Sequence, residues 1–176
     1  MNEKNHDIRQ HAHAARSAFA ELVKGYCNLH KLDDAGGILA GKPIEIDGVS
    51  FSLVHDEDVQ PGTLFLYTGY GSVPGERAAA VHASLLEINL FLHRIGGAAT
   101  FALAPDRNEV VLAEYFPLAG LTPELLDALL ADAVRNALSW RATHFLDKGQ
   151  AEAQVRARTD IGAAMRQRLL GKGNRQ

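Results

Sequence analysis

Residues 44–54 read IEIDGVSFSLV, and this stretch decides the class of fold. Its Asp47-Gly48 pair favours a type I′ turn, because both central residues of that turn need a positive φ. After the turn, the apolar residues Val49, Phe51 and Leu53 alternate with Ser50 and Ser52. This alternation gives an extended chain one apolar face. The stretch therefore predicts an antiparallel hairpin of two strands, 44–46 and 49–54.

Further strands are expected downstream of this hairpin. One covers residues 64–67, with leucines on one face and aromatic residues on the other. Two more, 99–103 and 110–116, flank the turn residues 105–108. Because hairpins join neighbouring strands, they predict a mostly antiparallel sheet.

Three long helices complete the order of elements. The first spans 5–29, with apolar residues at every third or fourth position. The second spans 75–95 and ends at Gly96-Gly97, because glycine tolerates the left-handed conformation of a helix C-cap. The third begins at the N-cap Thr122 and runs to about residue 147. The order α-β-β-β-α-β-β-α predicts an α+β fold, in which helices pack on a twisted, mostly antiparallel sheet.

The composition is that of one globular domain with a tail. The chain has 176 residues, of which 47% are hydrophobic, and its single cysteine allows no disulfide within the chain. Six basic and two acidic residues give residues 151–176 a charge of +4, which leaves −7 on residues 1–150 of a chain whose total is −3. We expect an α+β domain over 1–150 and a helical or mobile basic tail over 151–176. The acidic body argues against a nucleic-acid partner, and no stretch is apolar enough to span a membrane.

The second helix is apolar on two sides, since Leu86, Leu90 and Phe91 lie off its main stripe. Such a helix must bury both sides, and the same helix of a second subunit is the simplest cover. A central helix wrapped by its own domain is the alternative. We expect a homodimer whose interface includes Leu85, Ile88, Asn89, Phe91, Leu92 and Ile95.

Asn89 interrupts this apolar helix, and two roles are open for it. A buried amide at a helix seam fixes the register of the two helices at some cost in stability. The same amide can instead cap the edge of a nearby strand.

Enzyme and metal patterns are weak. Gly69–Gly75 precedes a helix, but it lacks the lysine and the spacing of a phosphate-binding loop, so it is interpreted as a flexible connection. Cys27 lies near the apolar stripe of the first helix, where a thiol is inert packing. Neither Cys27 with His30 nor the His11/His13 pair supplies enough converging ligands for zinc. We expect no catalytic, metal or cofactor site, and a hydrolase or metal enzyme is the least favoured class.

Five short blocks follow one another in a distinctive order: LLEIN at 85–89, GGA at 96–98, FAL at 101–103, VVL at 110–112 and FPL at 116–118. With FSL at 51–53 and LFLY at 64–67, this set resembles the Tir chaperone family, the class I chaperones of bacterial type III secretion. The resemblance covers roughly residues 10–147 and is most specific over 85–118.

The resemblance implies a homodimer in the bacterial cytoplasm that keeps the N-terminal segment of a secreted effector extended and secretion-competent. It implies no cofactor and no catalysis, and it makes the secretion apparatus or its ATPase a further partner. The basic tail departs from the family, whose members are generally acidic throughout. A regulatory or adaptor dimer of the same fold is the alternative function.

A chaperone of this kind must expose apolar surface to hold its client. The strands and the first helix supply the candidates, and an added client strand at a free sheet edge is a second mode of binding. We expect partner contacts at Ile8, Phe19, Phe51, Leu53, Phe65 and Tyr67.

Overall fold

The computed structural model describes residues 2–94, 98–104 and 106–147, together with positions 149, 153, 156, 157, 160, 163, 164 and 167; of residues 2–9 and 11 it describes the backbone only. The described strands form one antiparallel sheet in the order β1-β2-β3-β5-β4. They are β1 (Ile44–Ile46), β2 (Val49–Val54), β3 (Thr63–Ser72), β4 (Ala99–Ala104) and β5 (Glu109–Pro117). The helices are α1 (Asn2–His30), α2 (Ala35–Leu39), α3 (Ala78–Arg94), which follows the 3-10 turn η1 (Gly75–Arg77), and α4 (Pro123–Thr143).

The first hairpin has the predicted geometry. Asp47 and Gly48 both have a positive φ, 49° and 73°, as a type I′ turn requires. Ile44 pairs with Phe51, and burial alternates along β2 with the predicted period of two. The predicted α+β class and the antiparallel sheet are therefore confirmed.

Strand β3 is longer than predicted. It continues through the expected flexible loop to Ser72, and it pairs with β5 over its whole length. The register shifts between Gly69 and Gly71, and Gly71 has a φ of 102°, which is the signature of a bulge. The prediction of a loop from residue 69 is wrong, because the two glycines let the strand bulge where a bulkier residue would end it.

The start of α4 is where the sequence predicts it, but its end is not. The backbone N–H of Leu125 donates to Thr122 Oγ1 at 3.3 Å, which confirms the predicted N-cap. The helix ends at Thr143, earlier than predicted, because His144 and Phe145 adopt left-handed conformations with φ of 52° and 56°. The predicted glycine cap of α3 lies outside the described residues.

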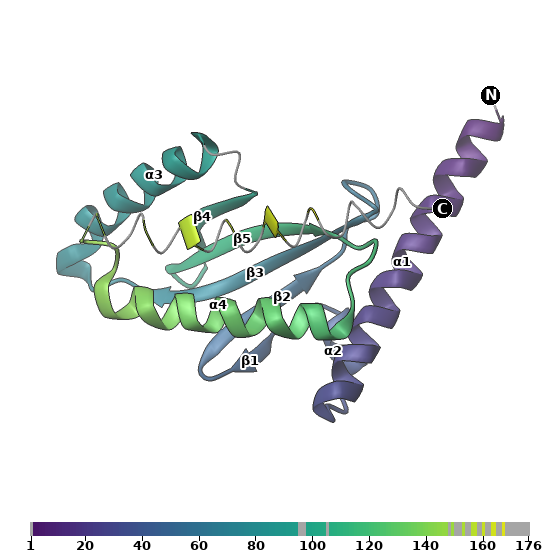
Figure 1. Ribbon diagram of the computed structural model, residues 1–176, viewed down its shortest axis with the longest axis horizontal. Helices are drawn as coiled ribbons and strands as arrows, with labels where there is room; N and C mark the ends of the chain where they lie inside the picture. The colour runs from purple at the N-terminus through teal and green to yellow at the C-terminus, as the bar shows by residue number, and fades with distance from the viewer. Residues whose placement is uncertain are drawn as a thin grey trace.

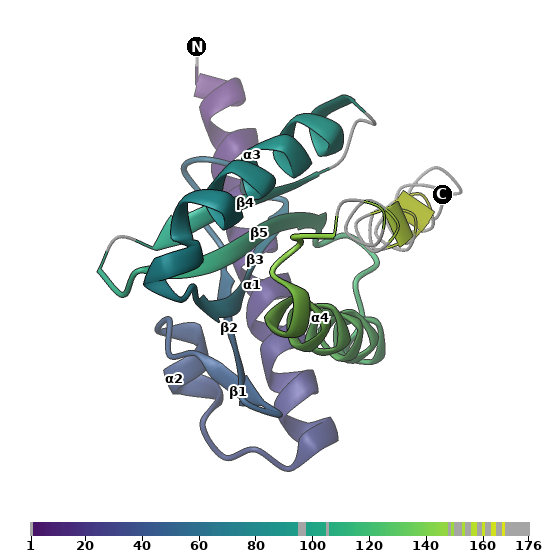
Figure 2. The same cartoon turned by 90° about the vertical axis from the view of Figure 1, so that its left-hand side faces the viewer.

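The described helices leave one face of the sheet open. Helix α4 runs along the sheet in contact with β2 and β3 (Figure 1), and α3 lies beside the edge strand β4 (Figure 2). Helix α1 packs on α4 so closely that a Cβ on Gly25 would lie 2.5 Å from Pro123 Cγ, and its N-terminal half projects away from the sheet (Figure 1). We call the face that packs on α4 the inner face and the opposite one the outer face.

One hydrophobic core joins the inner face to the helices. Trp140 of α4 is fully buried in it, and its ring meets Tyr70 of β3 edge-on at a centroid distance of 5.6 Å. Cys27 of α1 is buried in the same core, which confirms its packing role.

Candidate protein-binding surfaces

Helix α3 has one buried side and one exposed apolar side. Val81, Leu85, Ile88 and Leu92 are buried in the core of their own subunit. Leu86 and Leu90, one turn apart, are 69% and 62% exposed. The two-sided character is confirmed, but the interface assignment needs a correction. Leu85, Ile88 and Leu92 face their own sheet, so Leu86 and Leu90 are the leucines that a second copy can reach, and Ile95 lies outside the described residues.

Asn89 caps the edge of the sheet. Its side-chain Nδ2 donates to the carbonyl of Phe101 at 2.9 Å, and its Oδ1 accepts from the N–H of Phe101 at 2.8 Å. The side chain therefore replaces a neighbouring strand at one position of β4, and the strand-edge role is the one the structure supports. Asn89 is thus engaged inside its own subunit, and its contact with a second copy stays a prediction.

Phe91 contacts the tail. The guanidinium carbon of Arg156 lies 5.6 Å from the centroid of the half-buried Phe91 ring, in a cation–π geometry. The described positions between 153 and 167 are helical. Most of the tail prediction falls outside the described residues.

Three of the predicted partner contacts belong to the core instead. Phe51 is 0% exposed, and Leu53 and Phe19 are also buried. Phe51 and Leu53 point to the inner face, and Phe19 stacks on His55 with ring centroids 5.4 Å apart. Assigning these three residues to an exposed surface is wrong. The helices cover the side of β2 on which Phe51 and Leu53 lie, and Phe19 is on the side of α1 that packs into the core. The side chain of Ile8 lies outside the described residues.

The other two predicted contacts lie on the outer face. Phe65 is half-buried and Tyr67 is 38% exposed, while Tyr115 of β5, directly opposite Phe65, is 47% exposed. Sequence reasoning missed Tyr115, although its alternation with the buried Glu114 and Phe116 is visible in the chain. These aromatic residues form a patch that no described helix covers.

Metal and nucleophile chemistry finds no support in the described part of the chain. There, no three side chains of His, Cys, Asp or Glu converge as metal ligands would. His30 Nε2 instead lies 2.8 Å from Asp127 Oδ1 of α4. Burial raises the pKa of the Cys27 thiol, and the Asp34 carboxylate adds to the rise. Among the described helices, none has the length and apolarity needed to cross a membrane.

A family model for the Tir chaperone protein (CesT) family matches residues 44–141, more than half of the chain. The chain belongs to this family. The resemblance seen in the sequence is thereby confirmed, although this CesT-family match begins after α1 and ends before the basic tail. No match was found among curated proteins.

Three solved structures are similar to this CesT-family chain. The HopA1–SchA chaperone–effector complex is 14% identical, with 74% of this chain and 98% of the other covered and a TM-score of 0.53, which supports the fold. The ExsC–ExsE complex is 23% identical, with coverages of 57% and 73% and a TM-score of 0.48. The Yersinia pestis type III secretion chaperone SycH, in complex with a stable fragment of YscM2, is 17% identical, with coverages of 69% and 98% and a TM-score of 0.49.

Proposed function

We propose that this protein is a chaperone of bacterial type III secretion, which binds the N-terminal segment of a secreted effector and keeps it secretion-competent. The observation that carries the proposal is the family match over residues 44–141. The HopA1–SchA structure, whose fold this chain shares, is a chaperone–effector complex. A sheet face that no described helix covers, and that carries exposed aromatic residues, fits a protein that holds an extended segment.

We assign the client to the outer face of the sheet. Phe65, Tyr67 and Tyr115 lie there, and their rings offer large apolar contact areas with a polar hydroxyl on the two tyrosines. Phe51 and Leu53, on the inner face, contribute to stability rather than to binding.

We propose a homodimer that forms through the exposed side of α3. Leu86 and Leu90 are separated by one helical turn, so a second α3 can bury both at once. Burial of each leucine contributes roughly 1.5–3 kcal/mol, and a two-fold axis doubles the number of leucines buried.

We further infer that the protein acts without catalysis, in the bacterial cytoplasm, where a secretion chaperone meets its client before export. Cys27 is a poor nucleophile, because its buried thiol has a raised pKa and stays protonated. The secretion apparatus or its ATPase is the expected recipient of the complex.

The test is capture of the client in the native bacterium. The tagged full-length chain is purified from a strain whose secretion ATPase is inactive, and the bound proteins are identified by mass spectrometry. We expect an exported protein that binds through its N-terminal segment and whose export falls when this chain is deleted. A bound protein that is never exported, with export of all effectors unchanged, would contradict the proposal and favour the regulatory or adaptor dimer.

A further inference from the structure

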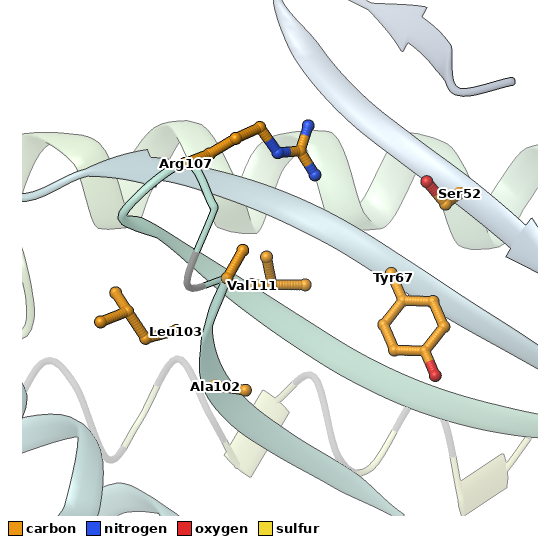
Figure 3. Close-up of a pocket in the computed structure, with 7 residues that line it drawn as sticks. Ser52, Tyr67, Ala102, Leu103, Arg107 and Val111 are labelled. Atoms are coloured by element: carbon orange, nitrogen blue, oxygen red, sulfur yellow. The ribbon is translucent and has the colours of Figure 1, made fainter.

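A groove of about 280 Å³ crosses the outer face at the turn between β4 and β5. Four strands contribute outward side chains to it: Ser52 of β2, Tyr67 of β3, Val111 of β5, and Ala102 and Ala104 of β4. In Figure 3 the side chain of Val111 lies between those of Leu103 and Tyr67, and Arg107 extends from the turn in the direction of β2. The lining combines the small side chains of Ser52, Ala102 and Ala104 with larger aromatic and aliphatic ones.

The groove differs from an ordinary solvated sheet face. An antiparallel sheet with one wet face normally alternates apolar residues inward with polar residues outward. Here the outward residues Val111 and Ala102 are apolar, and Ser52 is small and uncharged. Small apolar residues at outward positions keep the groove open, which indicates that an apolar group of another molecule fills it.

The edge of the sheet is closed at this end, which constrains how a client can bind. Asn89 already binds the N–H and the carbonyl of Phe101, the backbone groups that the centre of β4 would offer to an added strand. A client segment therefore cannot add to β4 as a continuous strand. A segment that reaches this end of the sheet must bind through its side chains.

The size of the groove selects the occupant. Its volume lies below the range of roughly 300–1,000 Å³ that is usual for small-molecule pockets. A stable interface between two copies takes about 20–30 residues of each partner, whereas seven residues line the groove. One large apolar side chain of an extended segment, such as leucine or phenylalanine, is the group that fits.

The charge at the rim selects the neighbours of that side chain. Of the residues that line the groove, Arg107 alone carries a charge. Its Nε lies 3.7 Å from Asp106 and 3.8 Å from Glu109, beyond hydrogen-bonding distance, and the side chain is largely exposed. Exposed pairs of this kind are weak, so the guanidinium is available to a carboxylate that can bind it more closely.

From these observations we propose that the groove is an anchor site for the client, which takes a large apolar side chain with an acidic residue beside it. This inference rests on the proposed chaperone function and deepens it, since it names the chemistry of the client segment. The groove supplies specificity that the aromatic patch does not, because the guanidinium of Arg107 can pair with an acidic neighbour of the anchor.

The experiment uses the nitrogen-15-labelled full-length chain and three synthetic peptides. One peptide has a Leu-Phe pair between glutamates, the second replaces the glutamates by lysines, and the third replaces the Leu-Phe pair by serines. We expect the first peptide alone to shift the amide signals of Ser52, Tyr67 and Val111. Ala102→Phe should weaken its binding about tenfold or more by filling the groove, whereas Ala131→Phe, on the exposed side of α4, should not. Arg107→Glu should reverse the preference, towards the lysine peptide.

The proposal is overturned if the lysine peptide binds wild type equally well, or if the shifts fall on α1 and α4. It is also overturned if the groove signals shift with protein concentration in the absence of peptide, since a second copy would then be the occupant. If the captured client binds wild type, Ala102→Phe and Arg107→Glu with equal affinity, the anchor site fails while the chaperone function stands. Peptide binding at the groove without any exported client would support the site and contradict the function.

Discussion

The two faces of the sheet are built from alternate residues of the same strands, yet they have opposite properties. Phe51 and Leu66 on the inner face are fully buried under the helices. Their neighbours Ser52 and Tyr67 on the outer face line a groove that no described helix covers. Side chains one residue apart in the sequence thus divide between folding and binding. A substitution on either face should accordingly change one property and spare the other.

The sharpest separation of the faces comes from two alanine substitutions on neighbouring strands. Phe51→Ala should lower the free energy of unfolding by about 3–5 kcal/mol, because it leaves a cavity in the core. Tyr67→Ala, on the outer face, should lower it by less than about 1 kcal/mol. Urea denaturation followed by circular dichroism measures both. Equal losses would mean that the outer face is covered in solution.

Helix α3 shows the same contrast between its two sides. Leu86→Glu with Leu90→Glu should convert the dimer into a folded monomer, because each lost leucine contact weakens association by roughly 1.5–3 kcal/mol. Leu92→Glu should unfold the subunit instead, since its side chain is buried in the core. Light scattering and circular dichroism distinguish the two outcomes. A wild-type protein that is monomeric at micromolar concentration would contradict the dimer.

Asn89 caps the edge strand β4, where the two faces of the sheet meet. Asn89→Ala leaves the N–H and the carbonyl of Phe101 without their partner, so we expect a loss of about 1–3 kcal/mol and concentration-dependent self-association of the free edge. Asn89→Asp keeps the acceptor but places a carboxylate oxygen opposite the carbonyl of Phe101, so it should destabilise the protein at least as much as Asn89→Ala at neutral pH. Sedimentation at several concentrations tests the association, and a fully monodisperse Asn89→Ala with wild-type stability would argue against the cap.

The smallest expected effect is a pH dependence at the end of α4. Burial lowers the pKa of His144, whose ring meets Trp140 at a centroid distance of 4.8 Å, and Arg77 lowers it further. The unfolded chain takes up a proton near the ordinary pKa of about 6.5, while the folded chain resists protonation until lower pH. The neutral His144 ring therefore contributes stability above about pH 6.5, and this contribution is lost as the pH falls below that value.

His144→Asn isolates this contribution, because asparagine tolerates the left-handed conformation of residue 144. The thermal midpoint of the wild type should fall more than that of His144→Asn between about pH 7.5 and pH 5.5. Parallel curves for the two proteins would assign the pH dependence to other groups.

The sequence predicted the local features of this fold well and the choice between faces poorly. The turn at Asp47-Gly48 and the cap at Thr122 follow from local backbone chemistry, and both were confirmed. Alternation along β2 predicts two faces but not which one the helices cover, so Phe51 was placed on the wrong side. The length of β3 was missed because a glycine bulge has the same sequence signature as a loop.

The groove itself left almost no signal in the sequence. Its residues come from strands that are distant in the chain and meet only through the strand order β2-β3-β5-β4. Arg107 lies in a turn, where charged residues are common and no hydrophobic periodicity predicts the direction of a side chain. Asn89 was the exception, because a polar residue inside an apolar helix stands out in the sequence, and one of its two predicted roles was correct.

If a client covers the outer face, the side chains there must become less exposed when it binds. Hydroxyl-radical footprinting of the chain, alone and with the client captured from the native bacterium, measures side-chain exposure directly. We expect Tyr67 and Tyr115 to lose reactivity in the complex while Leu138, exposed on α4, keeps its own. Protection of Leu138 with unchanged reactivity of the two tyrosines would contradict a client on the outer face.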